Sequence, residues 1–200
     1  MAGQRKVSMT DSDLKYMQEA IVLARKCKPE DKRPHPKVGV VIITEDNQVL
    51  HAYRGETGPG NHAEFAVLDK KHKDRSFAGA TVYTTLEPCS SRKHPKVDCA
   101  QRLIDAQVKR VFIGMIDPNP TIDGAGRDKL VDAKIDVHMF ENKLQAEIRS
   151  LNREFIRYWR EAGRAQGLNG KVAPLPRKRG LDDLYRRTNS VFWKANLGYD

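Results

Sequence analysis

The segment NHAEFAVL, residues 61–68, places His62 and Glu64 two positions apart at the start of an expected helix. Either residue alone is ordinary, because acidic side chains are common in the first turn of a helix. A partner motif follows at residues 85–99, TLEPCSSRKHPKVDC, which contains Cys89 and Cys99. One imidazole and two thiols form a set of three zinc ligands and leave a fourth position for water, as a catalytic zinc site needs. The sequence therefore predicts a zinc site made by His62, Cys89 and Cys99.

Glu64 is the candidate for proton transfer at this site. Zinc bound by two thiolates and one neutral imidazole carries no net charge, yet it still lowers the pKa of a bound water molecule. A carboxylate that is not a ligand must then move protons between that water and the substrate. Glu64 lies two residues from His62 at the same helix end, so we predict that it is the catalytic acid–base.

The two cysteines are suitably placed to meet the histidine. Asp98 and Gln101 form an Asp-x-x-Gln cap, which makes Cys99 the first residue of its expected helix. The amino end of a helix favours a thiolate at that position. Cys89 follows the end of an expected strand. Both sulfur atoms can therefore meet His62 at the end of the sheet where the helices begin.

Short β-branched runs and apolar residues at helical spacing alternate along the chain. Strands are expected at residues 37–44, 48–54, 80–85, 110–116 and 134–140. Helices are expected at residues 10–28, 62–71, 98–107, 126–133 and about 142–161. Turn residues separate the first two strands, which therefore form a hairpin. Strands that alternate with helices after a hairpin predict an α/β fold, a three-layer α/β/α sandwich on a mixed five-stranded sheet.

The order of the site residues resembles the signature of zinc deaminases, in which H-x-E is followed by P-C-x-x-C. The first half is intact, and nine residues instead of two separate the cysteines. A long insertion at this place is similar to the pyrimidine deaminase domain of riboflavin biosynthesis. Four segments carry this wider resemblance over about residues 12–163: PKVGVVI (36–42), TLEPCS (85–90), DPNPTIDGAG (117–126) and LNREFIRYWREAG (151–163).

The resemblance implies a cytidine deaminase-like fold with Zn²⁺ as the cofactor. It also implies hydrolytic deamination of a pyrimidine ring amino group, with a phosphorylated ribosylaminopyrimidine of riboflavin biosynthesis as the substrate. A separate reductase would then be a partner in the pathway. The basic insertion of this family covers a phosphorylated sugar, so the resemblance favours Arg92, Lys93 and Lys96 as a phosphate clamp over a solvated loop.

Three further residues are candidates for substrate binding. His35 replaces the asparagine that the family usually has before the proline of P-x-V-G. It either contacts the substrate in place of that asparagine or is an ordinary loop histidine. Asp117 and Asn119 resemble family residues at the substrate or at an interface, although Asp-Pro-Asn-Pro is also a rigid turn by its chemistry alone.

Composition sets the class of protein and its compartment. The chain has 200 residues, of which 39% are hydrophobic, which suits one domain or one domain with an appendage. Apolar stretches are too short for a membrane span, and the polar N-terminus does not have a signal-peptide core. Three cysteines without an export signal favour reduced thiols and metal binding over disulfides. We therefore expect a cytoplasmic protein without membrane contact.

The net charge of +10 indicates an anionic partner, and half of it lies in the tail. Residues 163–200 contain eight Lys and Arg against three Asp, which leaves +5. The regular pattern ends after Gly163, so we predict a deaminase domain at residues 1–163 and a basic tail at residues 164–200. The apolar residues in this tail predict docking on a neighbouring subunit, and hence a homo-oligomer.

Two rival functions remain open on the sequence alone. The basic tail is compatible with a deaminase that acts on cytosine or adenine in a nucleoside, a nucleotide or single-stranded nucleic acid. Nucleic acid is not favoured as a partner, because the pocket motifs contain few aromatic residues on which bases could stack. A non-catalytic binding module stabilised by zinc is the second rival. Glu64 argues against it, since a structural zinc site does not need that carboxylate.

Overall fold

The computed structural model of the chain describes residues 9–92, 95–120 and 122–165. Its centre is a five-stranded sheet with the order β2-β1-β3-β4-β5. The strands are β1 (Gly39–Ile43), β2 (Val49–Tyr53), β3 (Thr81–Thr84), β4 (Arg110–Ile113) and β5 (Asp136–Met139). Strand β1 pairs antiparallel with β2 and β3, whereas β3, β4 and β5 are parallel. The sheet is therefore mixed, and its parallel half begins at β3.

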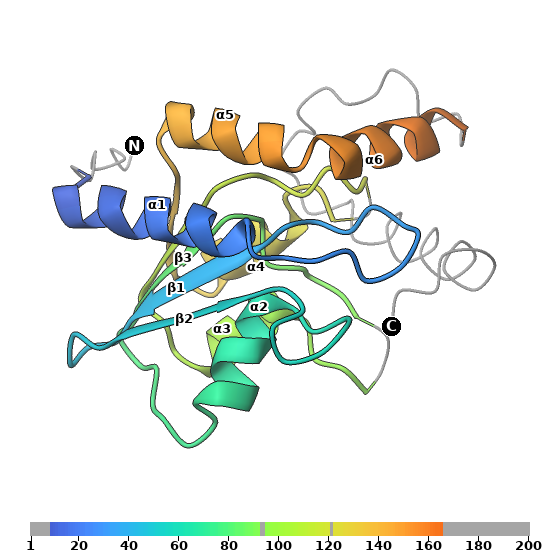
Figure 1. Cartoon of the computed structure of the whole chain (residues 1–200). Coiled ribbons are helices and arrows are strands. Elements are labelled where there is room, and N and C mark those ends of the chain that lie inside the picture. Colours follow the sequence, from blue (N-terminus) through green and yellow to red (C-terminus); the bar gives the residue numbers. More distant parts are fainter. Residues whose placement is uncertain (1–8, 93–94, 121, 166–200) are drawn as a thin grey trace.

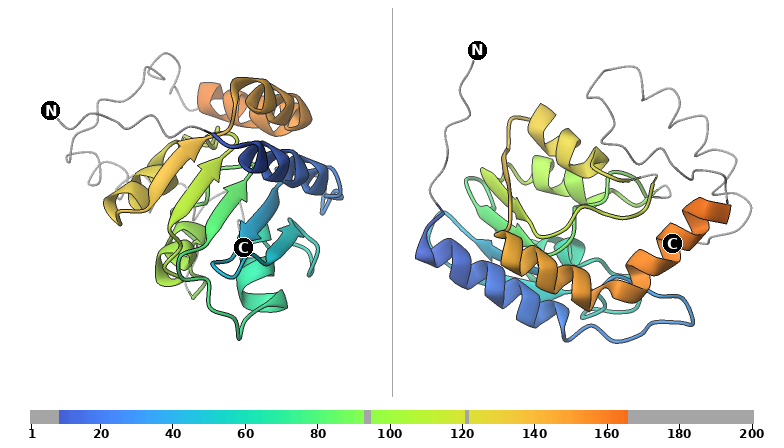
Figure 2. Two further views of the ribbon diagram at one scale, coloured as in Figure 1. Left: turned by 90° about the vertical axis from the view of Figure 1, so that its left-hand side faces the viewer. Right: turned by 90° about the horizontal axis from the view of Figure 1, so that it is seen from above.

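Helices cover both faces of this sheet (Figures 1 and 2). One layer contains α1 (Asp11–Ala24), α5 (Asn142–Leu151) and α6 (Arg153–Ala165). The other contains α2 (Ala63–Phe65), the π-helical segment η1 (Ala66–Lys71), α3 (Cys99–Asp105) and α4 (Ala125–Asp132). The predicted three-layer α/β/α sandwich on a mixed five-stranded sheet is confirmed.

Helix α1 begins at a capping box. The Thr10 hydroxyl accepts a hydrogen bond from the backbone N–H of Asp13, whose carboxylate accepts one from the Thr10 N–H. The same Asp13 side chain is buried and accepts a hydrogen bond of 2.6 Å from the Tyr83 hydroxyl in β3. This carboxylate therefore caps the helix and also joins it to the middle of the sheet.

The packing of α1 on β1 depends on a glycine. A Cβ atom on Gly39 would lie 2.1 Å from the Ala20 carbonyl oxygen and 2.6 Å from the Ala24 backbone nitrogen. Such distances are far inside van der Waals contact, and the neighbouring atoms belong to backbone that cannot rotate away. Helix and strand backbones thus touch at this point, which brings the chain after α1 close to the sheet.

The prediction of one long helix at about 142–161 is wrong, because Asn152 separates α5 from α6. Its side chain is buried and makes two hydrogen bonds to the backbone of Lys37. The Lys37 N–H donates to Oδ1 at 2.7 Å, and Nδ2 donates to the Lys37 carbonyl at 3.3 Å. Asn152 takes a non-helical conformation, with φ −103° and ψ 22°, at this junction. A tertiary contact therefore ends a helix whose sequence pattern continues.

The predicted division of the chain at residue 163 stays a prediction. Helix α6 continues to Ala165, and the remainder of the tail lies outside the described residues. Among the helices of residues 9–92, 95–120 and 122–165, none has the length and apolar character needed to cross a bilayer.

Replacement of Gly39 by alanine tests the contact between α1 and β1. We expect Gly39→Ala to lower the free energy of unfolding by about 2–3 kcal/mol, because overpacking forces backbone to move. Gly163→Ala in α6 is the matched control, since the nearest atom to its added Cβ would be 3.9 Å away. It should be neutral or stabilising by up to about 1 kcal/mol. Urea denaturation of both variants measures the difference, and equal midpoints would contradict the packing argument.

Candidate active site

Three side chains that can bind a metal converge where β2, β3 and the helices of one layer meet. His62 is the residue immediately before α2. Its Nδ1 atom lies 3.7 Å from the sulfur of Cys89 and 3.4 Å from the sulfur of Cys99. The three ligand atoms all lie within 4.8 Å of one another. The structure thus brings together the three residues that the sequence predicted as zinc ligands.

Backbone contacts join the two cysteines, and Cys99 is also placed by the helix that it begins. Cys99 is the first residue of α3, and the Asp98 side chain caps this helix by accepting from the Gln101 N–H at 2.8 Å. The Cys99 N–H donates to the Cys89 sulfur at 3.3 Å. The Ala100 N–H donates to the Cys89 carbonyl at 3.0 Å. The predicted cap is confirmed, and it points the amino end of α3 at Cys89.

The chemistry of this donor set fits a divalent cation. Burial, followed by the nearby Arg92 charge, holds the pKa of His62 well below its usual value, so the imidazole is neutral and can act as a ligand. The hydrogen bond with Cys89, then burial, raises the pKa of Cys99 well above that of a free thiol. Sequence reasoning favoured a thiolate at the helix end, but the surroundings oppose one unless a cation is close. A bound Zn²⁺ supplies that cation.

Glu64 lies beside the three candidate ligands without being part of their cluster. Its side chain is buried, and burial raises the pKa of the carboxyl group. The Thr84 hydroxyl lies 3.4 Å from Oε1, and a contact with the Cys99 thiol also favours the charged form. A buried carboxyl group with a raised pKa is suited to accept and then donate a proton.

His62, Glu64 and Cys89 lie in the wall of a cavity of about 180 Å³. Its walls are Pro36, Val38, Arg54, His62, Ala63, Glu64, Leu86, Glu87, Cys89, Ser91, Arg92, Asp117, Asn119, Ile122 and Phe155. Apolar side chains share this wall with polar groups that could orient a ligand, which suits a site for a small polar ring compound.

Asp117 and Asn119 reach the cavity because Glu87 fixes the segment that carries them. The buried Glu87 carboxylate accepts hydrogen bonds from the backbone N–H groups of Asp117, Gly124 and Arg127 at 3.1, 3.0 and 2.9 Å. The Asn119 N–H in turn donates to the Asp117 carboxylate at 2.9 Å. Burial, followed by the neighbouring Glu87 charge, raises the pKa of Asp117 to about 7. Both predicted residues are thus placed in the cavity wall.

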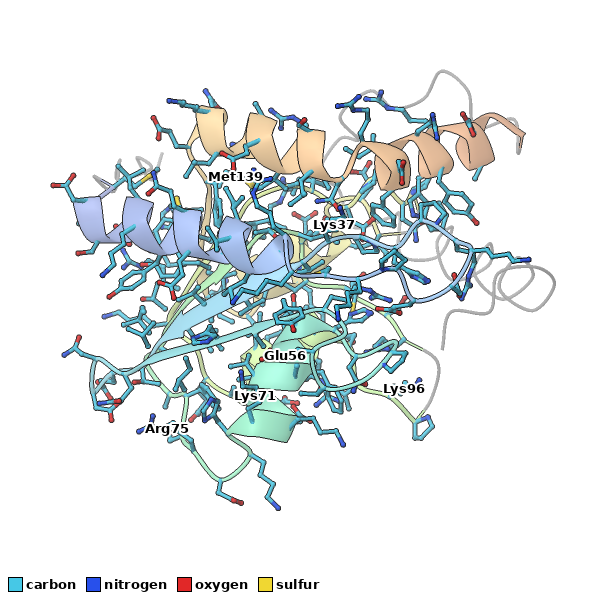
Figure 3. The ribbon with its side chains drawn as sticks, in the orientation of Figure 1. Lys37, Glu56, Lys71, Arg75, Lys96 and Met139 are labelled. Carbon is cyan, nitrogen blue, oxygen red and sulfur yellow. The ribbon has the colours of Figure 1, made fainter. Side chains whose placement is uncertain are left out.

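The insertion between the cysteines contributes Ser91 and Arg92 to the cavity wall. The Arg92 guanidinium lies 3.5 Å from the Gly60 carbonyl oxygen. Lys96 is exposed and lies on the outer loop shown in Figure 3, apart from the cavity wall. Lys93 lies outside the described residues. The predicted clamp is therefore represented in the cavity wall by Arg92.

His35 is not among the residues of the cavity wall, although the next residue, Pro36, is. It lies in an adjoining groove, where its Nε2 atom is 3.0 Å from the Asp31 carboxylate. Its Nδ1 atom is 3.3 Å from the guanidinium of Arg54, which does line the cavity. Its predicted role in substrate binding remains a prediction.

Sequence reasoning missed Arg54, Glu87 and Phe155 as cavity residues. The sequence did contain an indication for Arg54. Alternate residues of β2 face inward, and Arg54 continues the inward-facing positions of Leu50 and Ala52. A charged residue in an inward-facing position often serves a site. The sequence contains no such indication for Phe155, because an apolar residue in a helix is most often part of the core.

Comparison with known proteins assigns the family. The family described as the cytidine and deoxycytidylate deaminase zinc-binding region matches residues 10–115. The chain belongs to the cytidine and deoxycytidylate deaminase family. Zinc and deaminase chemistry, both expected from the sequence, are properties of this family.

Relatives within the deaminase family are riboflavin biosynthesis proteins. RibD of Actinobacillus pleuropneumoniae is 40% identical over 152 residues, which cover 74% of this chain and 38% of that protein. RibD of Aquifex aeolicus is 36% identical over 171 residues, which cover 82% of this chain and 46% of that protein. The predicted resemblance is confirmed, and the chain spans less than half the length of these two relatives.

Solved structures of deaminases share the fold. A diaminohydroxyphosphoribosylaminopyrimidine deaminase/5-amino-6-(5-phosphoribosylamino)uracil reductase of Thermotoga maritima superposes with a TM-score of 0.63 at 30% identity, covering 74% of this chain and 41% of that chain. The Rib2 deaminase of Aspergillus oryzae, in complex with DARIPP, gives a TM-score of 0.59 at 21% identity and is covered to 98%, with 74% of this chain aligned. The second likeness concerns the fold alone.

Removal of the two thiols tests the metal site. We expect the purified chain to contain one zinc ion and the double variant Cys89→Ala/Cys99→Ala to contain none, because one imidazole cannot hold zinc alone. Elemental analysis measures both. Cys27→Ala is the matched control, since the third cysteine is half-buried elsewhere and donates to the Val38 carbonyl. Full zinc content in the double variant would place the metal at another site.

Proposed function

We propose that the chain catalyses hydrolytic deamination of a pyrimidine ring amino group, with a phosphorylated ribosylaminopyrimidine of riboflavin biosynthesis as the substrate. The observation that carries this proposal is the placement of the buried Glu64 carboxyl group beside His62, Cys89 and Cys99, with Glu64, His62 and Cys89 in the wall of one cavity. The RibD relatives and the Thermotoga maritima structure support the choice of substrate.

The roles within the site follow from the donor set and the cavity. His62, Cys89 and Cys99 would hold Zn²⁺, which activates a water molecule when it is bound. In the overall reaction the ring carbon gains a bond to oxygen and loses its bond to nitrogen, so the products are the ring carbonyl and ammonia. Glu64 takes the proton that the water loses and delivers it to the leaving amino group.

The remaining polar side chains of the cavity would orient the ring. Asp117 and Asn119 present hydrogen-bonding groups from one segment, and Arg92 presents a positive charge from the insertion. Pyrimidine edges carry amide-like donors and acceptors, which such side chains can match. Arg92, with Lys93 and Lys96 of the same insertion, would bind the phosphate of the substrate.

Ammonia release from a panel of substrates tests the proposed function. The panel contains a ribosylaminopyrimidine phosphate, cytosine, cytidine, their phosphates and single-stranded nucleic acid. We expect the ribosylaminopyrimidine phosphate to give the highest kcat/KM. A preference for cytidine phosphates would keep the deaminase activity and replace the proposed substrate by a cytidine nucleotide. Release only from single-stranded RNA or DNA, with salt-dependent binding, would replace the proposal by the nucleic-acid function.

Replacement of Glu64 tests its role in proton transfer. We expect Glu64→Gln to retain zinc and to lower kcat by at least about 10²-fold, the usual size of a general acid–base contribution. Glu45→Gln in the exposed β1–β2 turn is the matched control and should keep normal turnover. Zinc content and steady-state kinetics of both variants give the comparison. Near-normal turnover of Glu64→Gln would reject the role.

A further inference from the structure

Two arginine side chains line the cavity whose wall also contains the candidate zinc ligands His62 and Cys89. They belong to segments far apart in the sequence: Arg54 directly follows β2, and Arg92 lies in the insertion between the cysteines. The sequence predicted only the second as a group that binds phosphate. The contacts of Arg54 indicate that it shares this role.

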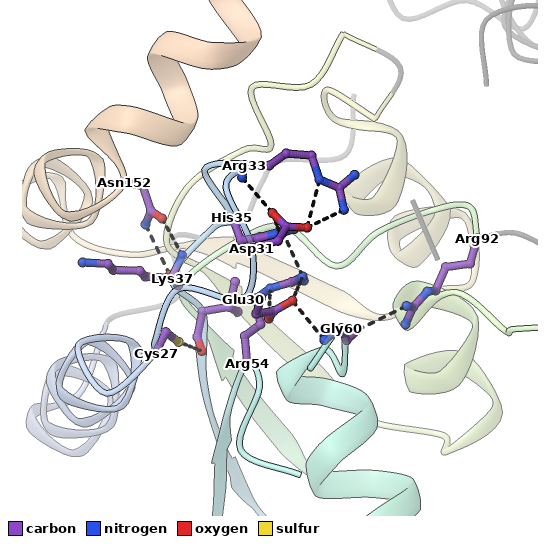
Figure 4. Close-up of polar contacts among 11 residues, drawn as sticks. Cys27, Glu30, Asp31, Arg33, His35, Lys37, Arg54, Gly60, Arg92 and Asn152 are labelled. Carbon is purple, nitrogen blue, oxygen red and sulfur yellow. Dashed lines mark hydrogen bonds and ion pairs between the residues drawn. The ribbon is translucent and has the colours of Figure 1, made fainter. Parts of the chain in front are cut away.

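Glu30 holds the guanidinium of Arg54 in one orientation (Figure 4). The Arg54 Nη2 atom donates to Glu30 Oε2 at 3.0 Å. Nε lies 3.0 Å from Oε1, close enough for an ion pair although its N–H is poorly directed for a hydrogen bond. The side chains of Arg54 and Glu30 are only 7% and 12% exposed. Two contacts on a planar, buried group leave it little freedom to rotate.

This arrangement leaves one nitrogen of Arg54 available. The Nη1 atom donates to none of the residues that the structure describes, whereas Nη2 also contacts the His35 ring at 3.3 Å. A guanidinium group carries five N–H donors in a fixed fork. Because Glu30 occupies the edge formed by Nε and Nη2, the Nη1 donors are free for a ligand in the cavity that Arg54 lines.

Gly60 connects the two arginines. Its N–H donates to Glu30 Oε2 at 2.9 Å, and its carbonyl accepts from Arg92 Nη2 at 3.5 Å. Figure 4 shows the resulting chain of contacts from Arg54 through Glu30 and Gly60 to Arg92. Gly60 has φ +77°, a left-handed conformation that favours glycine. The two backbone groups of this one residue therefore contact both arginine networks.

The charge of this region favours an anion. Two guanidinium groups and one carboxylate leave a net charge of +1 on the chain of contacts. The adjoining groove of about 690 Å³ shares Pro36, Arg54 and Phe155 with the cavity. Its lining has seven Lys and Arg against three acidic residues, a net +4: Lys28, Lys32, Arg33, Lys37, Arg54, Arg153 and Arg157 against Asp31, Glu154 and Glu161. The cavity wall itself has these two arginines against three carboxyl groups, so an oxyanion at this junction would be stabilised mainly from the side of the groove.

We propose that Arg54 and Arg92 together form a phosphate-binding subsite at the mouth of the cavity, and that Glu30 is a positioning residue for Arg54. The inference rests on the proposed function, because the phosphate belongs to the substrate whose ring enters the same cavity. A tetrahedral phosphate accepts hydrogen bonds from several directions, so two guanidinium groups from different segments can bind it at once.

Kinetic comparison of a phosphorylated and a dephosphorylated substrate tests the subsite. We expect Arg54→Lys to raise KM for the phosphorylated substrate by about tenfold, the loss of one charge-assisted contact, and to change KM for the dephosphorylated one by less than about twofold. Glu30→Gln should shift KM in the same direction by a smaller factor. Arg25→Lys is the matched control, since Arg25 forms an exposed ion pair with Glu147 in another part of the molecule.

A purely structural ion pair between Arg54 and Glu30 would give a different result. Arg54→Lys would then lower activity equally on both substrates, together with the unfolding temperature, and this outcome would overturn the inference. An unchanged KM on both substrates would overturn it as well. Arg54→Lys keeps the charge and the aliphatic stem, so it is the deciding variant if the more disruptive Arg54→Gln does not fold.

Calorimetry with ribose 5-phosphate separates this inference from the proposed function. The zinc-loaded full chain should bind ribose 5-phosphate and not ribose, and Arg54→Lys and Arg92→Gln should each weaken binding by about tenfold. Such binding without deamination of any panel substrate would retain the subsite and reject the function. Deamination together with binding that is insensitive to Arg54, or no binding of ribose 5-phosphate, would retain the function and reject the subsite.

Discussion

The carboxylate of Glu87 is the group on which the wall of the cavity depends. Burial of an ionised carboxylate is costly unless hydrogen bonds replace its water. Here backbone N–H groups of Asp117, Gly124 and Arg127 replace it, and hydrogen bonds to a charged acceptor contribute about 1.5–3 kcal/mol each. Because Glu87 lies two residues before Cys89, the segment 117–127 is fixed relative to a candidate zinc ligand. The part of the wall that contains Asp117 and Asn119 and the part that contains the candidate metal ligands are therefore one unit.

The sheet explains why these segments meet. Strands β3 and β4 are parallel and adjacent, so the chain leaves both at the same edge of the sheet. Cys89 follows β3 and Asp117 follows β4 at this edge. Helix α3 begins at Cys99 and presents its amino end to Cys89, while His62 stands at the start of α2. The three candidate ligands come from three segments. Each lies at or near the end of a helix or strand, and the order of the strands brings these ends together.

Much of this was predictable from local sequence. The runs of β-branched and aromatic residues predicted all five strands, and β1, β3 and β4 are mostly buried. The capping residue Asp98 marked the start of α3, since its side chain bonds to backbone within the same turn. The histidine, the two cysteines and Glu64 were visible because few other constellations need those residue types in that order.

The remainder depends on contacts between distant residues, which carry no local signal. The partner of Asn152 is Lys37, which lies 115 positions away, so the helical pattern at residues 142–161 gave no indication of a break. Glu30 reaches Arg54 across 24 positions, and only the fold shows that their pair borders the cavity.

Asn152 bonds to both backbone groups of Lys37, as a residue of a neighbouring strand would. Pro36 and Phe155 flank this link on its two sides and both face the cavity. One side-chain amide thus ties the start of α6 to the segment before β1, next to two residues of the cavity wall.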